Sequence, residues 1–295
     1  MKIITPMTVT PASLIYTNIP EDDAPIYDPL STYAVGNRVI SSSIIYYSVA
    51  DNNLGHDPAT SPTKWTPEQS TNRMRPFDDS ITSQATIADR MEFVIQTTGT
   101  ANGVALLNFD ATVARVICID QYDGVVYDTT VNPVSTSGIN NFFKWLFWPI
   151  TRVRDLTLTD LPLYSDMTIR IILDRPGLDV GCGAVVVGAV KSIGQVQNGV
   201  SIGYSDYSPK ERDKFGHITF KEGDYSRDGG IPLWLQKGEV DDVFAFFIKR
   251  RVKPVVIIGN PNLSSAIFYG IVKDLRIVLS YPTYAVCSFN TESLT

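Results

Sequence analysis

The residues that could do chemistry in this chain of 295 residues are few and widely spaced. His56 and His217 are its two histidines, and neither is followed by a second His or Cys at the spacing of a metal site. Each lies beside a glycine, which predicts a surface loop for both. The chain has no G-x-S-x-G, Walker or H-E-x-x-H motif, so these motifs predict no nucleophile elbow, phosphate loop or zinc protease site.

Carboxylates are numerous and could in principle cleave a glycosidic bond. That reaction needs two carboxyl groups held roughly 5 to 10 Å apart across a groove. The spacing predicts no such pair: Asp241-Asp242 fit the first turn of a helix, and Asp78-Asp79 fit a turn before a strand. We therefore expect no catalytic residue, no cofactor and no metal ligand. The carboxylates considered are Asp78, Asp79, Asp206, Asp213, Asp224, Asp241 and Asp242.

Aromatic residues carry a stronger signal, because the chain has 14 Tyr, 13 Phe and 4 Trp. Residues 33–65 contain short β-favouring runs between Gly-Asn and Asn-Asn turns, which predicts a small hairpin module. Tyr33, Tyr47 and Trp65 in this module are candidates for stacking on a glycan. The alternative is that they form its core, which we favour because so short a unit has few other large apolar groups to bury.

A second aromatic group lies in the stretch FFKWLFWPI, which ends at Ile150. Trp145 and Trp148 could stack on a sugar or anchor a neighbouring subunit. The interpretation we favour is core packing of a strand with its connecting loop.

Composition limits the classes of partner. The net charge of −6 and pI near 5.0 argue against nucleic acid or an anionic membrane as the main partner. No apolar run approaches the roughly 20 residues of a membrane span, so no membrane insertion is expected. Cys118, Cys182 and Cys287 are far apart in apolar runs, which indicates buried thiols in a protein folded in a reducing cytoplasm.

The chain is expected to divide into four parts. Residues 1–32 contain five prolines and predict an extended arm that lies on another surface. Residues 33–80 form the small module. Residues 81–203 read as alternating strands about ten residues apart, which predicts an antiparallel β-sandwich or jelly roll. Residues 204–295 predict a β-sandwich with one packed helix, since Val240, Val243, Phe244 and Phe247 follow helical spacing.

The small module resembles the chitin-binding type of carbohydrate-binding module. The residues that carry the resemblance occur in the order Tyr33, Gly36, Val39, Tyr46 or Tyr47, Asn53, Gly55, Pro58 and Trp65. The chain departs from the usual pattern in lacking a Trp just before Tyr33, where Tyr27 stands.

The whole chain is similar to virion proteins of tailed bacteriophages. Its matching segments are TNRMRPFDDSITSQ, YSDYSPKERDKFGHITF and FAFFIKRRVKPVVIIGN, which follow the module in that order. The last of these also resembles baseplate and distal-tail β-sandwich domains. The resemblance implies assembly in several copies with other tail proteins, in a virion made in the host cytoplasm.

From these observations we expect a mainly β structural protein of a phage tail or tail-attached apparatus, which is not an enzyme and binds no nucleic acid. The alternative is a receptor-binding tail protein that uses the module to bind host-surface polysaccharide. A glycan-degrading enzyme is the third candidate, and it would need a carboxylate groove.

Overall fold

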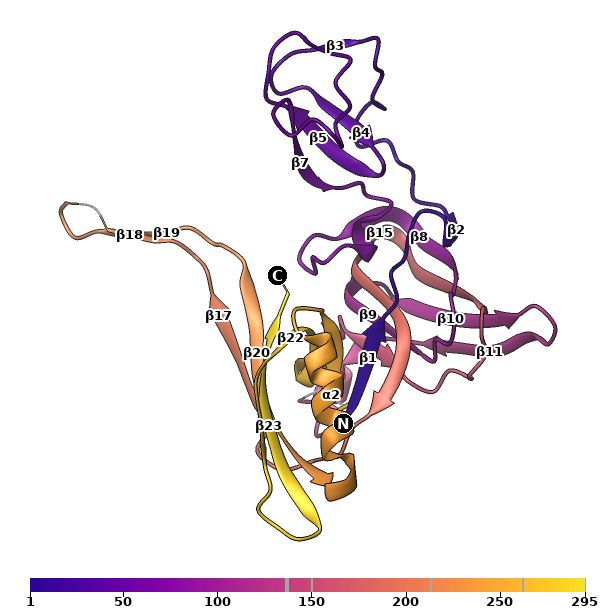
Figure 1. Cartoon of the computed structure of the whole chain (residues 1–295), viewed down its shortest axis with the longest axis vertical. Coiled ribbons are helices and arrows are strands. Elements are labelled where there is room, and N and C mark those ends of the chain that lie inside the picture. Colours follow the sequence, from indigo (N-terminus) through magenta and orange to yellow (C-terminus); the bar gives the residue numbers. More distant parts are fainter. Residues whose placement is uncertain (136–137, 150, 213, 262, 295) are drawn as a thin grey trace.

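The computed structural model describes residues 1–135, 138–149, 151–212, 214–261 and 263–294. The chain is mainly β, as predicted, and its described strands form one 14-stranded sheet and four small sheets. Figure 1 shows a body of two lobes, an N-terminal module above it and a long hairpin that projects to one side. Every ladder between named strands in the described ranges is antiparallel.

The first lobe is organised by one long strand, β15 (Thr168–Ser192). Its register with β8 shifts between Arg175 and Asp179, where β15 bends, and β8 pairs with it on both sides of the bend. The first half lies between β8 and β10, and the second half pairs with β9 and β1. Side chains from both halves share one core, which makes the lobe sandwich-like. Its other strands are β2 (Leu14–Thr17), β8 (Ala85–Gln96), β9 (Gly103–Asp110), β10 (Val113–Asp120), β11 (Gly124–Val131) and β14 (Leu156–Leu158).

The second lobe contains the predicted helix, α2 (Val240–Arg250). Its apolar face buries Val243 and Phe247, and the Phe247 ring lies 5.3 Å from that of Phe289. Asp241 and Asp242 occupy the first turn and basic residues the last, as expected from the helix dipole. The strands of this lobe are β16 (Gln195–Val196), β17 (Ser201–Asp206), β20 (Tyr225–Gln236), β21 (Val255–Ile258), β22 (Ile267–Val278) and β23 (Tyr284–Ser293), with 3-10 turns at Lys237–Glu239 and Ser264–Ala266.

The N-terminal strand β1 (Lys2–Pro6) joins the two lobes, which differs from the extended arm expected for residues 1–32. It pairs with β15 on one side and β21 on the other. Ile3 and Ile4 are both 0% exposed and enter different cores. Gly188 of β15 allows this close approach, because a Cβ there would overlap the carbonyl oxygen of Thr5. Proline at position 6 ends the strand rather than preventing it.

The N-terminal module is a separate small β unit. It comprises β3 (Thr32–Tyr33), β4 (Arg38–Ser41), β5 (Ile44–Ser48), β6 (Asn53–Leu54) and β7 (Trp65–Ser70). A parallel bridge from Ile26 to Ile40 brings the preceding segment onto it. The 3-10 turn η1 (Arg75–Phe77) then leads back to β8 in the first lobe.

Two excursions leave the body. The first is the long hairpin of β17 and β20, whose outer part holds β18 (Lys210–Arg212) and β19 (Ile218–Phe220). The predicted domain boundary at 203/204 falls inside β17. The second follows β11 and contains β12 (Val134–Ser135), the helix α1 (Phe142–Phe147) and β13 (Thr151–Arg152).

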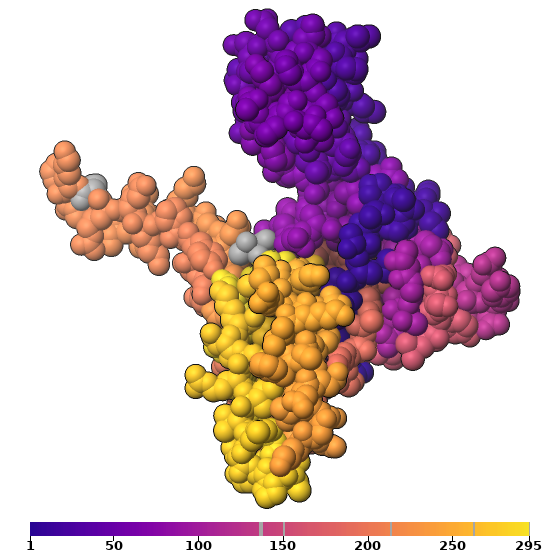
Figure 2. Space-filling view, in the orientation of Figure 1, coloured from indigo at the N-terminus to yellow at the C-terminus, as the bar shows by residue number. Residues whose placement is uncertain are grey.

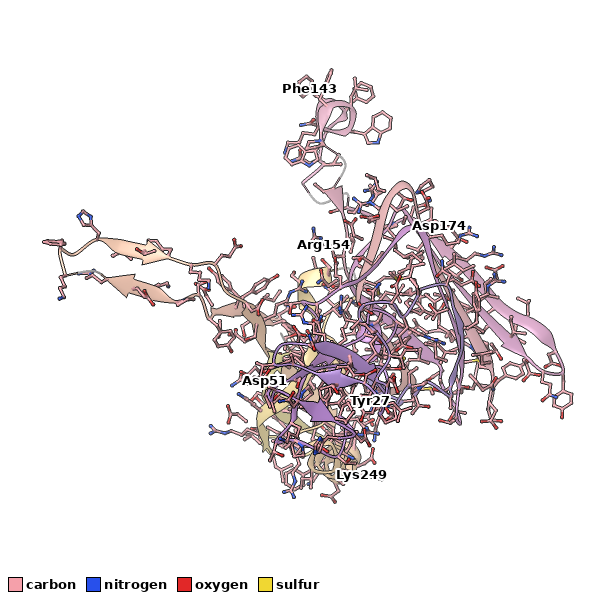
Figure 3. All side chains as sticks on the ribbon, turned by 90° about the horizontal axis from the view of Figure 1, so that it is seen from above. Tyr27, Asp51, Phe143, Arg154, Asp174 and Lys249 are labelled. Atoms are coloured by element: carbon pink, nitrogen blue, oxygen red, sulfur yellow. The ribbon has the colours of Figure 1, made fainter. Side chains whose placement is uncertain are left out.

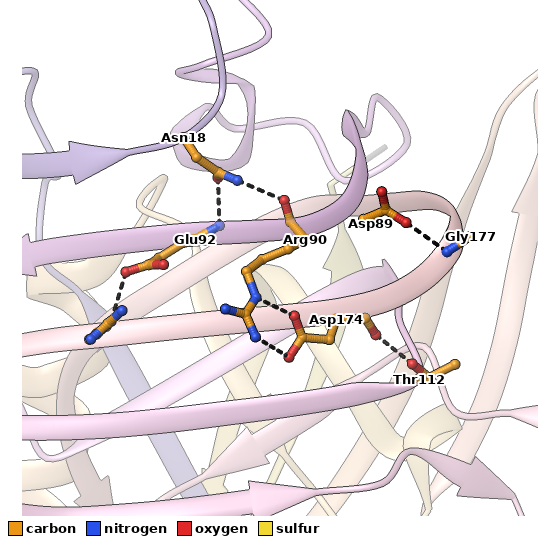
Figure 4. A network of polar contacts seen from close by, with 8 residues as sticks. Asn18, Asp89, Arg90, Glu92, Thr112, Asp174 and Gly177 are labelled. Carbon is orange, nitrogen blue, oxygen red and sulfur yellow. Dashed lines mark hydrogen bonds and ion pairs between the residues drawn. The ribbon is translucent and has the colours of Figure 1, made fainter.

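A polar network holds the bend between β8 and β15 (Figure 4). Arg90 donates to both carboxylate oxygens of Asp174, at 2.5 and 3.1 Å. Asp89, which has a left-handed φ of 62°, accepts the backbone N–H of Gly177 at 2.6 Å. Asn18 bonds the edge of β8 there: its side-chain N–H donates to Arg90 O, and its side-chain oxygen accepts the Glu92 N–H. These carboxylates are therefore engaged in holding the bend.

Candidate interaction surfaces

The three candidate glycan-stacking residues do not form one platform. Trp65 is 1% exposed, and its indole N–H donates to the carbonyl oxygen of His56 at 2.8 Å. The Tyr33 ring packs against Trp65 with centroids 5.1 Å apart. Both rings therefore belong to the small core of the module, which also contains Val39 and Tyr46.

Tyr47 lies elsewhere. It follows Tyr46 on β5, and successive side chains of a strand point to opposite faces, so Tyr47 points away from Trp65 and is 37% exposed. Tyr27 stacks on Tyr33 at 5.8 Å and meets Trp65 edge-on at 6.0 Å. The residue that stands in place of the usual Trp is thus a third ring of the core.

The projecting hairpin, residues 201–230, is called the arm below. In Figure 1 it leaves the body at β17 and β20, and Figure 2 shows that its outer part stands free of both lobes. Large apolar side chains along it are exposed. Exposed apolar side chains that gather on one surface often mark a site of protein–protein contact. Those on the arm are Ile202, Tyr204, Tyr207, Phe215, Ile218, Phe220 and Tyr225.

The base of the arm is fixed to the first lobe by an ion pair. Arg227 on β20 donates to Asp155 at 2.6 Å, and the Asp155 side chain is 4% exposed. Asp155 also accepts the backbone N–H of Asn108 on β9 at 2.9 Å. A cavity of about 210 Å³ lies beside this pair and is also lined by Arg154 and Tyr269.

The excursion from β11 ends in α1, at the top of Figure 3, where Phe143 is labelled well away from the body. Residues 138–149 of this excursion are called the aromatic tip below. The core packing expected for Trp145 and Trp148 is wrong, because both side chains are largely exposed, at 67% and 41%. No residue of α1 is buried. Asn141 caps the helix by accepting the N–H of Lys144 at 2.8 Å.

A charged cleft lies between the lobes. It has a volume of about 500 Å³ and is lined by Asp78 and Asp79 on one side and by Arg250 and Lys253 on the other, with Tyr269 between them. Burial, together with the nearby carboxylates Asp79 and Asp78, raises the pKa of the Tyr269 hydroxyl to about 12. Burial also raises the pKa of the Asp78 carboxyl above its usual range.

The remaining groups considered for chemistry are dispersed. His56 and His217 are exposed, as predicted, and Asp206 and Asp224 lie on the solvent-exposed arm, while Asp213 is outside the described residues. Within the described ranges, no three His, Cys, Asp or Glu side chains gather as a metal site would require. The three cysteines are buried free thiols, as predicted, and burial raises the pKa of Cys118 and Cys182 to about 12 and of Cys287 to about 11.

A search of the described helices finds none that is both long and apolar enough to cross a bilayer. Comparison with protein-family profiles, with curated proteins and with solved structures gives no match for this chain.

Proposed function

We propose that the chain is a structural component of a bacteriophage tail or tail-attached apparatus and acts by protein–protein assembly, with copies of itself and with other tail proteins. The observation that supports assembly is the arm, an exposed apolar ribbon that projects from the body without a core of its own. The tail setting rests on the sequence resemblance, and its site would be the virion tail, assembled in the host cytoplasm.

The arm has the features of an element that gains its packing from a neighbour. A two-stranded hairpin in water is marginally stable by itself, and this one exposes Tyr204 by 72% and Phe220 by 68%. Among the described strands, β17 pairs with β20 alone, so its outer edge offers unpaired backbone groups. A neighbouring protein that covers the ribbon would bury its apolar side chains and pair its free backbone groups.

Charges on the outer arm add specificity to such a contact. Lys210, Glu211 and Arg212 follow one another on β18, and Lys221 and Glu222 follow β19. Mixed charges around apolar anchors resemble the rim and centre of a protein interface. A permanent contact of this kind buries more than about 1,000 Å² in total.

The test uses an arm-shortened variant. The backbone N–H of Tyr207 bonds the carbonyl of Asp224 at 3.0 Å, so these residues already face each other across the ribbon. Replacing residues 208–223 by Asn-Gly should close the hairpin there with a two-residue turn. The matched control is Tyr122→Ser, which removes an 89% exposed aromatic from the tip of another hairpin.

Sedimentation velocity and electron microscopy should show ordered multimers for the parent chain and for the control as concentration rises, and no multimers for the shortened variant. A parent that stays monomeric, alone and with the virion proteins made beside it, contradicts assembly. Gold-labelled antibodies against the chain should mark the tails of particles from cells that express it, and labelling of another part of the particle contradicts the tail assignment.

Glycan binding is the alternative function. It is supported by the module, which stands apart from the lobes with its own sheet and core (Figure 1). The burial of Trp65 takes one of the three candidate stacking rings out of reach of a sugar, and Tyr33 is partly buried against it. Retention of the chain on chitin or host polysaccharide that is lost in Tyr47→Ala would favour the alternative.

A further inference from the structure

We propose that the aromatic tip inserts into the interface of an anionic lipid bilayer. The proposal goes beyond the assembly function and does not depend on it, because it rests on a different part of the molecule. It combines three observations, which are the wide apolar face that the tip exposes, the charge of the segment that carries it, and the direction in which its one lysine points.

The first observation is that α1 exposes a wide apolar face. Phe142, Phe143, Trp145, Leu146 and Phe147 are each exposed by 55% or more, and they occupy five of its six positions. At 100° per residue these side chains span roughly 200° of the helix circumference, and Lys144 lies on the remaining arc. A wide apolar face of Phe, Trp and Leu opposite a cation is the pattern of helices that lie in a membrane interface.

The second observation is the charge. Between Asp128 and Asp155 the chain has no Asp or Glu, although the protein as a whole carries a net charge of −6. The same segment contains three cations, Lys144, Arg152 and Arg154. Arg152 and Arg154 are exposed and follow the tip in the chain. Lys144 and Arg152, the cations nearest the apolar tip in the chain, complement the negative surface of an anionic membrane.

The third observation concerns Lys144, the one cation within α1. Its ammonium donates to the carbonyl of Gly138 at 3.1 Å, so its charge lies back at the start of the tip rather than at its apex. It also lies 5.3 Å from the centre of the Trp148 ring. A lysine whose charge is held at the base of an inserted segment is placed to meet lipid headgroups while its stem stays with apolar neighbours.

The size of the tip suits the interface and not a full crossing. Six helical residues extend about 9 Å, far less than the roughly 30 Å of a bilayer's hydrocarbon core. Tryptophan is enriched at this depth, where its ring is half in lipid and half in water. The expectation that an anionic membrane is not the main partner came from the charge averaged over the whole chain, which conceals the local excess of cations.

The test compares vesicles of phosphatidylcholine alone with vesicles that also contain phosphatidylglycerol. The full-length chain should float with the anionic vesicles, with a blue shift of tryptophan emission, and increasing salt should weaken the binding. Phe143→Ser with Leu146→Ser should lower the affinity about tenfold or more, because two large apolar groups no longer enter lipid. The matched control is Phe220→Ser on the arm, which is as exposed as Phe143 (68% against 70%) and should leave binding unchanged.

A second variant separates charge from apolar insertion. Lys144→Glu with Arg152→Glu keeps every aromatic of the tip and should abolish the preference for phosphatidylglycerol. The variants change exposed positions apart from the partly buried Lys144, and an unchanged circular dichroism spectrum and melting temperature would confirm that they fold. The proposal is overturned if the parent binds neither kind of vesicle, or if the serine variant binds as tightly as the parent. It is also overturned if the tip serves only to join copies of the chain, seen as multimers without vesicles that the serine variant lacks.

Discussion

Asp155 and Arg227 form an ion pair of 2.6 Å that holds both excursions to the same place in the body. Asp155 ends the segment that carries the aromatic tip, and Arg227 lies on β20 at the base of the arm. The backbone of Asn108 on β9 supplies a further hydrogen bond to the carboxylate. The position of each excursion relative to the other therefore depends on one buried carboxylate.

Asp155→Ala should destabilise the protein by roughly 3 kcal/mol, since removing one partner of a buried pair leaves the other without compensation. Arg227 is 34% exposed and regains some water, which keeps the loss toward the lower end of that range. Urea unfolding followed by circular dichroism measures the change. As a control, Asp128→Asn breaks the exposed pair with Arg115 and should have a much smaller effect. Equal losses in the two variants would contradict the role given to Asp155.

The N-terminal strand provides a second prediction. Ile4 is fully buried between the two lobes, so Ile4→Ala should lower the free energy of unfolding by roughly 2 to 5 kcal/mol. Ile26→Ala at a position 78% exposed should stay within about 0.5 kcal/mol. Deleting residues 1–6 should unfold the body, because β15 and β21 would each lose a partner. A truncated chain with unchanged stability would mean that the N-terminal segment is peripheral to the body, as its proline spacing predicted.

The sequence predicted local structure better than it predicted which strands pair with one another. The helix at Val240–Arg250 was recognisable from its period and its charges. The pairing of β1 with β15 and β21 could not be predicted, because these partners lie about 190 and 255 residues along the chain and nothing local specifies them. Pro6 pairs with Gly188 as the last residue of the strand and Pro11 lies beyond it, so proline spacing alone gave the wrong picture.

The aromatic residues show the same limit. Alternation on β5 separates Tyr46 from Tyr47, and that much could be predicted from the strand period. For residues 142–148, hydrophobicity predicted burial, whereas these side chains are exposed. Two signals for exposure were present, the Asn141 cap and the absence of acids from Thr129 to Arg154, but neither says which surface covers the segment.

The module core provides a third prediction. Trp65→Ala should cost roughly 3 to 5 kcal/mol of local stability, because it removes the largest side chain of a core with few others. Limited proteolysis should then cut within residues 26–70 while the two lobes remain resistant. Tyr47→Ala changes a partly exposed residue on the opposite face and should leave the module resistant. A resistant Trp65→Ala protein would mean that the ring is not needed for packing.

The interlobe cleft makes the stability depend on pH. Burial raises the pKa of Asp78 in the folded protein above its unfolded value near 3.8, despite the hydrogen bond from the Ser80 N–H and the attraction of Arg75. The folded state therefore binds this proton more tightly than the unfolded state. Its contribution to stability is fully present below the unfolded pKa and is lost as pH rises through the folded pKa.

Asp78→Asn should accordingly raise the melting temperature at neutral pH, because the amide is uncharged and keeps an oxygen that can accept the Ser80 N–H. The gain should shrink as pH falls and disappear below about pH 3.8, where the native carboxyl is protonated in both states. Asp22→Asn removes the same charge from an exposed position and controls for net charge. Thermal melts of the three proteins from acid to neutral pH decide the matter. A gain that is the same at every pH would show that desolvation of the Asp78 charge is not its cause.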